Sequence, residues 1–282
     1  MTSCIFVFYL LVFPATLAQA TVVLSAGTPA PRLAPFTPLA LPPLAPFRLR
    51  GQSASSLIAP TQNDTTDPDA LYGKRDNVAL AQQAAAIWQA RLQKNPNDFE
   101  SAWKLARGAY WIGTHGPPAD RRPALEQGIT AGRAATRIAP SRPEGHMWLA
   151  ADMGALAESF GLRQGLKYRG EIKNELLTVL RLDPAYEQGS ADRALGRWYY
   201  KVPGLFGGSD QKSEEHLRRS LSYNANSSAS LYFLGETLIA LKRKPEAKDV
   251  LERVLAAPID PGWAAEDRDF KAKAQQLIET LK

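Results

Sequence analysis

Four prolines at regular intervals constrain the fold of this chain more than any other feature. Each of them follows a segment with apolar residues at helical spacing, and they stand at Pro96, Pro140, Pro184 and Pro258. Because the residue before a proline avoids helical geometry, we expect each proline to end a helix. The intervals are 44, 44 and 74 residues, and the last corresponds to two repeats. Such spacing is typical of a solenoid of helical hairpins.

Two Leu-Gly pairs, Leu195-Gly196 and Leu234-Gly235, identify the type of solenoid. In a tetratricopeptide unit a small residue lets the two helices of a hairpin approach closely. A large residue of the second helix, here Leu217 or Leu251, then fills the space beside it. Runs of β-branched residues and hairpin turns are rare in the sequence. The sequence therefore predicts an all-α, tetratricopeptide-like helical-hairpin solenoid over residues 71–282.

Some positions depart from the tetratricopeptide pattern. Arg107 stands where glycine is usual, and we expect Gly128 and Gly132 to soften their helix. The spacing of 44 residues also exceeds the usual length of about 34. HEAT-like repeats therefore remain an alternative.

The residues by which each repeat exceeds the usual tetratricopeptide length fall at the same point of each hairpin. They form the segments 113–123, 159–167 and 203–210, which lie between paired helices. We expect three long inter-helix loops that project from one edge of the solenoid, where insertions often line a functional face.

The first 20 residues resemble a signal peptide. Residues 5–20 are apolar and broken by Pro14, and Ala18-Gln19-Ala20 offers a small-x-small cleavage site. The sequence therefore predicts an exported protein, periplasmic or secreted. No Lys or Arg precedes the apolar run, so an uncleaved membrane anchor remains an alternative.

A proline-rich segment follows over residues 21–70. Its prolines lack the amide donor that helices and central strands need, so we expect a disordered linker without helix. Its leucines and phenylalanines leave a second interpretation, a tether that docks on the repeats.

Several classes of function lack a motif in this chain. The net charge of +6 is dispersed, which disfavours nucleic-acid binding. The chain has one cysteine, Cys4, and its histidines His115, His146 and His216 are far apart, so no metal or cofactor site is expected. Asp152 and Glu158 fall on different faces of one helix. We therefore predict a binding protein and no enzyme, and an enzyme subunit with an aromatic cleft remains the alternative.

Aromatic residues and one glycine-rich loop are the candidate binding site. Trp198, Tyr199 and Tyr200 are consecutive in a predicted helix, so they cannot all face one core. Trp148 lies in the preceding repeat. The loop that follows contributes the remaining candidates, Pro203, Gly204, Phe206, Gly207 and Gly208.

The stretch ALGRWYYKVPGLFGGSDQKSEEHLRRSL, residues 194–221, resembles the T-component (TatT-like) family of TRAP transporters. The resemblance extends over about residues 80–282 and is sharpest in the loop 203–208. It implies a periplasmic scaffold that binds a solute-binding protein or a small apolar ligand, with a trimer as the expected assembly. Members often carry a lipid anchor on a cysteine, and none stands at that place here. A general tetratricopeptide interaction module in envelope assembly remains an alternative.

The glycines of the loop predict a fixed shape, because ordering glycine costs more backbone entropy than ordering any other residue. That shape would place Phe206 against the repeats or at the mouth of a cleft. We favour packing, for which Phe206→Ala would cost about 3–5 kcal/mol.

The signal-peptide interpretation makes a direct prediction. Cleavage after Ala20 would leave Thr21 as the first residue of the mature protein. N-terminal sequencing of the exported protein checks this, and a cytoplasmic protein with Met1 intact would contradict it.

Overall fold

The computed structural model describes residues 67–281, which form eleven α-helices and one 3-10 turn. Nothing is described for the side chain of Leu162. The predicted signal peptide, residues 1–20, and most of the predicted linker lie outside the described residues. The helices are α1 (Pro68–Tyr72), α2 (Val78–Lys94), α3 (Phe99–His115), α4 (Pro118–Ile138), α5 (Pro143–Phe160), α6 (Leu162–Leu182), α7 (Tyr186–Lys201), α8 (Asp210–Tyr223), α9 (Ser228–Ala240), α10 (Lys244–Ala256) and α11 (Ala264–Glu279), with the 3-10 turn η1 (Gly204–Phe206) between α7 and α8.

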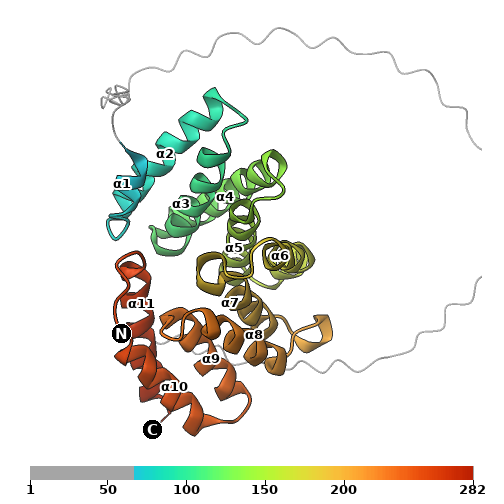
Figure 1. The fold of residues 1–282 in the computed structure, drawn as a ribbon, viewed down its shortest axis with the longest axis vertical. Helices are drawn as coiled ribbons and strands as arrows, with labels where there is room; N and C mark the ends of the chain where they lie inside the picture. Colours follow the sequence, from blue (N-terminus) through green and yellow to red (C-terminus); the bar gives the residue numbers. More distant parts are fainter. Residues whose placement is uncertain (1–66, 282) are drawn as a thin grey trace, which may run out of the picture. The chain divides into compact units, whose positions relative to one another are not determined.

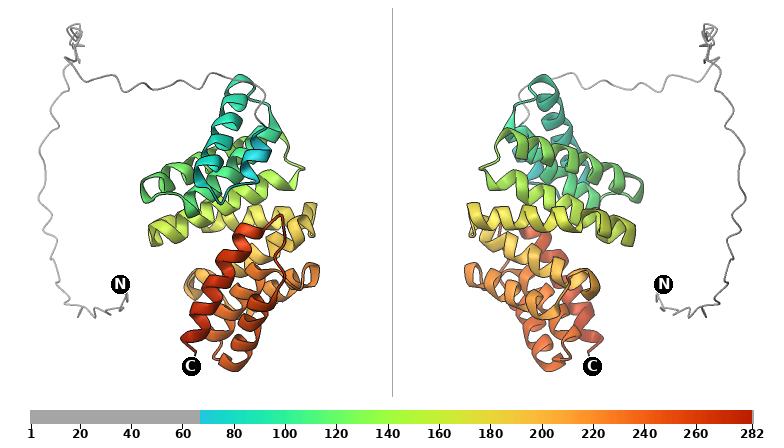
Figure 2. Two further views of the ribbon diagram at one scale, coloured as in Figure 1. Left: turned by 90° about the vertical axis from the view of Figure 1, so that its left-hand side faces the viewer. Right: turned by 90° about the vertical axis from the view of Figure 1, so that its right-hand side faces the viewer.

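The all-α, tetratricopeptide-like solenoid is confirmed, and the prolines end helices as predicted. Helices α2, α4, α6 and α10 each stop two residues before Pro96, Pro140, Pro184 and Pro258. The hairpins α3–α4, α5–α6, α7–α8 and α9–α10 stack in chain order, as both views of Figure 2 show. Helix α11 packs on the last hairpin and closes the array.

Helix α1 corrects the predicted boundary of the linker. Pro68 is the first residue of this helix, although we expected no helix before residue 71. The first turn of a helix has no acceptor for its amide groups, so a proline fits there. The side chain of Asp67 caps the helix by accepting a hydrogen bond from the amide of Asp69.

The Leu-Gly pairs act as predicted. A Cβ added to Gly196 would lie 2.5 Å from Cγ of Leu217, and one added to Gly235 would lie 2.6 Å from a methyl group of Leu251. Gly132 likewise allows α4 and α5 to approach closely, because a Cβ added to it would lie 2.9 Å from Cα of Leu149. The expectation that such glycines merely soften α4 is therefore wrong, because they permit close helix packing.

The expectation of long inter-helix loops holds at only one of its three places. Most of segments 113–123 and 159–167 is helical, and the breaks there are Gly116–Pro117 and Gly161 alone. Prolines begin α4, and Gly161 turns the chain with φ of +90°. The additional residues therefore lengthen helices, and α4 and α6 each have 21 residues. Only the third segment forms an extended connection, between α7 and α8.

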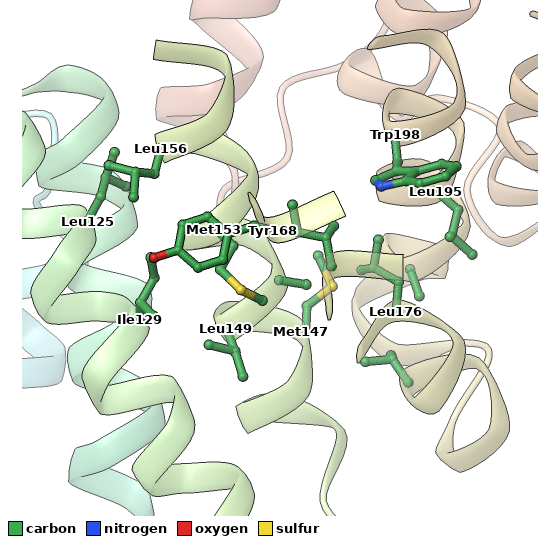
Figure 3. Close-up of a cluster of buried hydrophobic side chains, with 14 of the residues drawn as sticks. Leu125, Ile129, Met147, Leu149, Met153, Leu156, Tyr168, Leu176, Leu195 and Trp198 are labelled. Atoms are coloured by element: carbon green, nitrogen blue, oxygen red, sulfur yellow. The ribbon is translucent and has the colours of Figure 1, made fainter. Parts of the chain in front are cut away.

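The core follows the solenoid as three consecutive clusters of buried side chains. Figure 3 shows the middle cluster, in which Leu125 and Ile129 of α4 face α5 and Leu195 and Trp198 of α7 lie at the far side. No helix among the described residues is long and apolar enough to span a membrane.

The two ends of the described chain meet. In Figure 1, the upper end of α11 lies just below α1 and the turn that follows it. Arg75, in the turn between α1 and α2, makes the contact. Its guanidinium pairs with Glu266 of α11 at 2.5 Å and donates to the carbonyl of Gly262 at 2.9 Å. Arg268 and Asp76 form a second ion pair across the same junction. The helices therefore close into a ring, which we call the helical ring.

Asp152 is an unusual member of the core. It is 0% exposed, and neither carboxylate oxygen has a hydrogen-bond partner among the described residues. It packs on Gly128 of α4, where any side chain would overlap it. Burial raises the pKa of the Asp152 carboxyl well above its ordinary value, because the charged form loses its hydration.

We predict that Asp152→Asn stabilises the fold at neutral pH and has little effect near pH 4. As pH rises from about 4 to the raised native pKa, the unfolded chain loses this proton first, so the wild type loses about 1.4 kcal/mol per unit of pKa shift. The amide does not titrate and avoids this loss. Thermal unfolding of both proteins at the two pH values checks this, and an equal difference at both would contradict it.

Candidate functional site

The helical ring surrounds a cavity of about 1220 Å³. The first helices of the hairpins, α3, α5, α7 and α9, line it together with the start of α6 and with α11. Most of its surface is apolar. A cavity of this size and character is typical of a small-molecule site.

Aromatic side chains from helices far apart in sequence form much of the wall. Tyr110 of α3 packs on Trp148 of α5 with ring centroids 5.8 Å apart. On the opposite side, Phe233 of α9 meets Phe270 of α11 edge to face at 5.4 Å. Such rings offer large rigid surfaces for apolar contact.

Two glycines keep part of the cavity open. Gly154 of α5 and Gly165 of α6 line it, and a Cβ added to either would meet no atom within 4 Å. Glycine inside a helix costs about 0.5–1 kcal/mol relative to alanine. Packing among the described residues requires neither glycine, in contrast to Gly196 and Gly235. Their effect is to leave space.

Several charged side chains at the cavity wall form local pairs. Arg197 of α7 is held between Glu158 at 2.9 Å and Glu236 at 2.5 Å. Lys273 pairs with Asp269 at 2.6 Å within α11. Paired charges of this kind leave little electrostatic interaction for a ligand.

The beginning of α7 is strained at the cavity. Glu187 and Gln188 have left-handed backbone angles, with φ of 43° and 59°, and Gly189 follows at 74°. Left-handed geometry costs a residue with a side chain about 1–2 kcal/mol. Burial raises the pKa of the Glu187 carboxyl, which accepts a hydrogen bond from the Tyr186 hydroxyl at 3.3 Å. Backbone strain of this kind is frequent at binding sites.

The cavity brings together three of the predicted site residues, Trp148, Trp198 and Pro203. The Trp198 indole donates a hydrogen bond to the carbonyl of Arg169 at 3.0 Å, which fixes its position. Tyr199 turns away and stacks on His216 of α8 with ring centroids 5.4 Å apart. Tyr200 and the loop residues Gly204, Phe206, Gly207 and Gly208 do not line the cavity.

The loop between α7 and α8 has a fixed shape. Gly207 has φ of +101°, which favours glycine, and a Cβ on Gly208 would overlap the carbonyl oxygen of Val202. The amide of Ser209 donates to the carbonyl of Tyr199 at 2.9 Å. The loop presents Leu205, 89% exposed, at its tip.

Phe206 is not a buried anchor. It is 37% exposed, and its described partner is the guanidinium of Arg169, 5.5 Å from the ring centroid. The expected packing and its cost of about 3–5 kcal/mol are therefore wrong, because that range applies to fully buried rings.

Sequence reasoning missed most of the cavity wall. Tyr110, Gly154, Arg193, Trp263 and Phe270 were not among the candidates. One signal in α5 was available, because Ala151, Gly154, Ala155 and Glu158 recur at helical spacing and form a stripe of mostly small residues.

Two family models match the chain. The model described as TRAP transporter T-component matches residues 151–279, which supports the resemblance seen at residues 194–221 over a shorter range than expected. The model described as regulator of microtubule dynamics protein 1-3 matches residues 68–206. No curated protein sequence matches the chain significantly.

Solved structures show the fold. A thermophilic TPR protein of Thermus thermophilus, TTC0263, superposes with a TM-score of 0.57 at 20% identity, over 75% of this chain and 97% of that one. MamA is similar at 16% identity with a TM-score of 0.45, over 71% of this chain and 95% of that one. The former likeness establishes the tetratricopeptide architecture.

The loop geometry predicts different effects for two neighbouring glycines. Gly208→Ala must displace the Val202 carbonyl, so we expect a loss of about 1–3 kcal/mol of stability. Gly204→Ala is the matched control, since its Cβ would meet nothing within 4 Å, and it should change stability by less than about 0.5 kcal/mol. Chemical denaturation of both variants checks this, and equal midpoints would contradict the fixed shape.

Proposed function

We propose that this tetratricopeptide-type helical repeat protein, whose residues 151–279 match the TRAP T-component model, binds a small, mainly apolar ligand inside the helical ring. In this proposal it is an exported accessory component of a TRAP-type uptake system. The T-component match supports the system, and the cavity supports the ligand. The leader over residues 1–20 and the linker that follows belong to the same proposal.

The observation that best supports a bound ligand is the open space at Gly154. A helix that only packed against its neighbours would gain stability from alanine at this position. The cavity-lining residues around it, Ala151, Ala155 and Trp148, are apolar. An apolar molecule in this space would gain about 25 cal/mol for each Å² of apolar surface removed from water.

The partner protein is proposed to dock on the loop between α7 and α8. Leu205 projects from a rigid loop, so a partner could bury it with little loss of entropy. Arg169, Lys173 and Lys212 lie near this loop, and none forms an ion pair among residues 67–281. The partner that fits is therefore one with an apolar pocket and acidic groups around it, such as a solute-binding protein.

A general interaction module in envelope assembly is the alternative. It would use the loop surface and would leave the cavity without a role. The two proposals differ in whether filling the cavity matters.

We predict that Gly154→Trp strongly weakens binding of the neutral fluorescent probe N-phenylnaphthylamine. The indole would project into the cavity, where no protein atom opposes the new Cβ, and it would occupy the ligand's space. Fluorescence titration of the full chain should show a Kd raised at least about tenfold.

Gly170→Trp is the matched control. Gly170 also lies in a helix and has no atom within 4 Å of an added Cβ, but it is exposed and does not line the cavity. This variant should bind like the wild type, and both variants should melt at or slightly above the wild-type temperature. No probe binding by the wild type, or equal binding by all three proteins, would contradict the ligand proposal.

A further inference from the structure

We propose that Arg193 receives the anionic group of the cavity's ligand, so that the ligand is an amphipathic anion with an apolar body and one carboxylate-like end. This inference rests on the proposed function, because it specifies the chemical class of the same ligand.

Arg193 differs from the other cations of the cavity wall in having no ion pair and no side-chain hydrogen bond among the described residues. Arg197, Lys201 and Lys273 each form an ion pair with a carboxylate, and Arg169 donates to the carbonyl of Leu166 at 3.0 Å. The guanidinium of Arg193 has no ion pair and no hydrogen bond with any residue from 67 to 281. A guanidinium offers five N–H donors in a planar fork, so several donors are free for a ligand.

The position of Arg193 makes this lack of a partner costly. Its side chain lies in the cavity, partly exposed, with the guanidinium 5.7 Å from the ring centroid of Trp263. Burial lowers the pKa of Arg193, although an arginine keeps its charge at physiological pH. An anion in the cavity would compensate the lost hydration, and a carboxylate can accept two parallel hydrogen bonds from the fork.

The nearby carboxylates do not replace such an anion. The Glu187 carboxylate exerts the largest electrostatic effect on Arg193, but no nitrogen of the guanidinium lies within 4.0 Å of its oxygens. The Glu187 carboxyl instead accepts a hydrogen bond from the Tyr186 hydroxyl. Glu266 also acts on Arg193 and is held by Arg75 at the ring junction. Tyr110, the remaining titratable neighbour, has its pKa raised to about 12 by burial and stays neutral.

The neighbouring Arg197 is a cation of the same cavity wall that does have ion-pair partners. It stands four residues after Arg193 on α7, where side chains share a helix face. Glu158 and Glu236 clamp it from α5 and α9. Two arginines on one face thus have opposite roles, with Arg197 joining helices and Arg193 left for a ligand.

The test compares two molecules with the same alkyl body, decanoate and decanol, as competitors of N-phenylnaphthylamine in the full chain. We expect decanoate to displace the probe at about tenfold lower concentration than decanol, since one charge-assisted contact of about 1.4 kcal/mol gives this factor. In Arg193→Gln the preference should vanish, while decanol and the probe bind as before. Arg193→Lys should keep part of the preference.

Lys201→Gln is the matched control, because Lys201 is a paired cation on the same helix and cavity wall. It should leave the preference unchanged. Equal displacement by decanoate and decanol in the wild type, or equal weakening of both in Arg193→Gln, would overturn the assignment while probe binding still supported an apolar cavity. Absence of probe binding in the wild type would instead remove the proposed function itself.

Discussion

The contact of Arg75 with Glu266 and Gly262 is the interaction on which the cavity depends. Without it, the hairpins would present an open concave groove, as solenoids generally do. Arg75 is 8% exposed, and its guanidinium lies between the rings of Tyr72 and Trp111, 5.1 and 5.3 Å from their centroids. Breaking a buried pair of this kind leaves an uncompensated charge and typically costs about 3–5 kcal/mol. The junction is therefore a strong closure of the ring.

Glycine has two opposite roles in this structure, and the distinction bears directly on function. Leucine side chains of the partner helix occupy the space beside Gly196 and Gly235, so these glycines allow the two helices of a hairpin to pack closely. Gly154 and Gly165 face open space inside the ring, so they contribute room instead of contact. A protein whose helices only needed to pack would gain from larger residues at the second pair of positions.

Charged side chains are arranged differently inside the helical ring and at the loop between α7 and α8. Inside the ring, ion pairs such as Arg197 with Glu158 cancel charge, whereas Arg193 has no ion pair among the described residues. Near the loop between α7 and α8, Arg169, Lys173 and Lys212 lie over the rings of Phe206, Trp198 and Tyr199 and form no ion pair within residues 67–281. In the proposed function, the cavity receives a single anionic group in a mainly apolar space, and the loop between α7 and α8 faces an acidic protein surface.

The sequence by itself determined the features that depend on residues close together in the chain, namely helix ends and the pairing of helices into hairpins. Prolines end helices through local sterics, and a Leu-Gly pair specifies one close approach, so the repeats could be predicted. Of the site candidates named from the sequence, Trp148, Trp198 and Pro203 line the cavity. Only the tertiary structure decided that segments 113–123 and 159–167 extend helices, that Phe206 is exposed, and that Arg193 has no ion pair within residues 67–281. These outcomes depend on the superhelical path, because small rotations between successive hairpins accumulate until α11 meets α1. That contact joins residues 191 positions apart, and no local pattern encodes it.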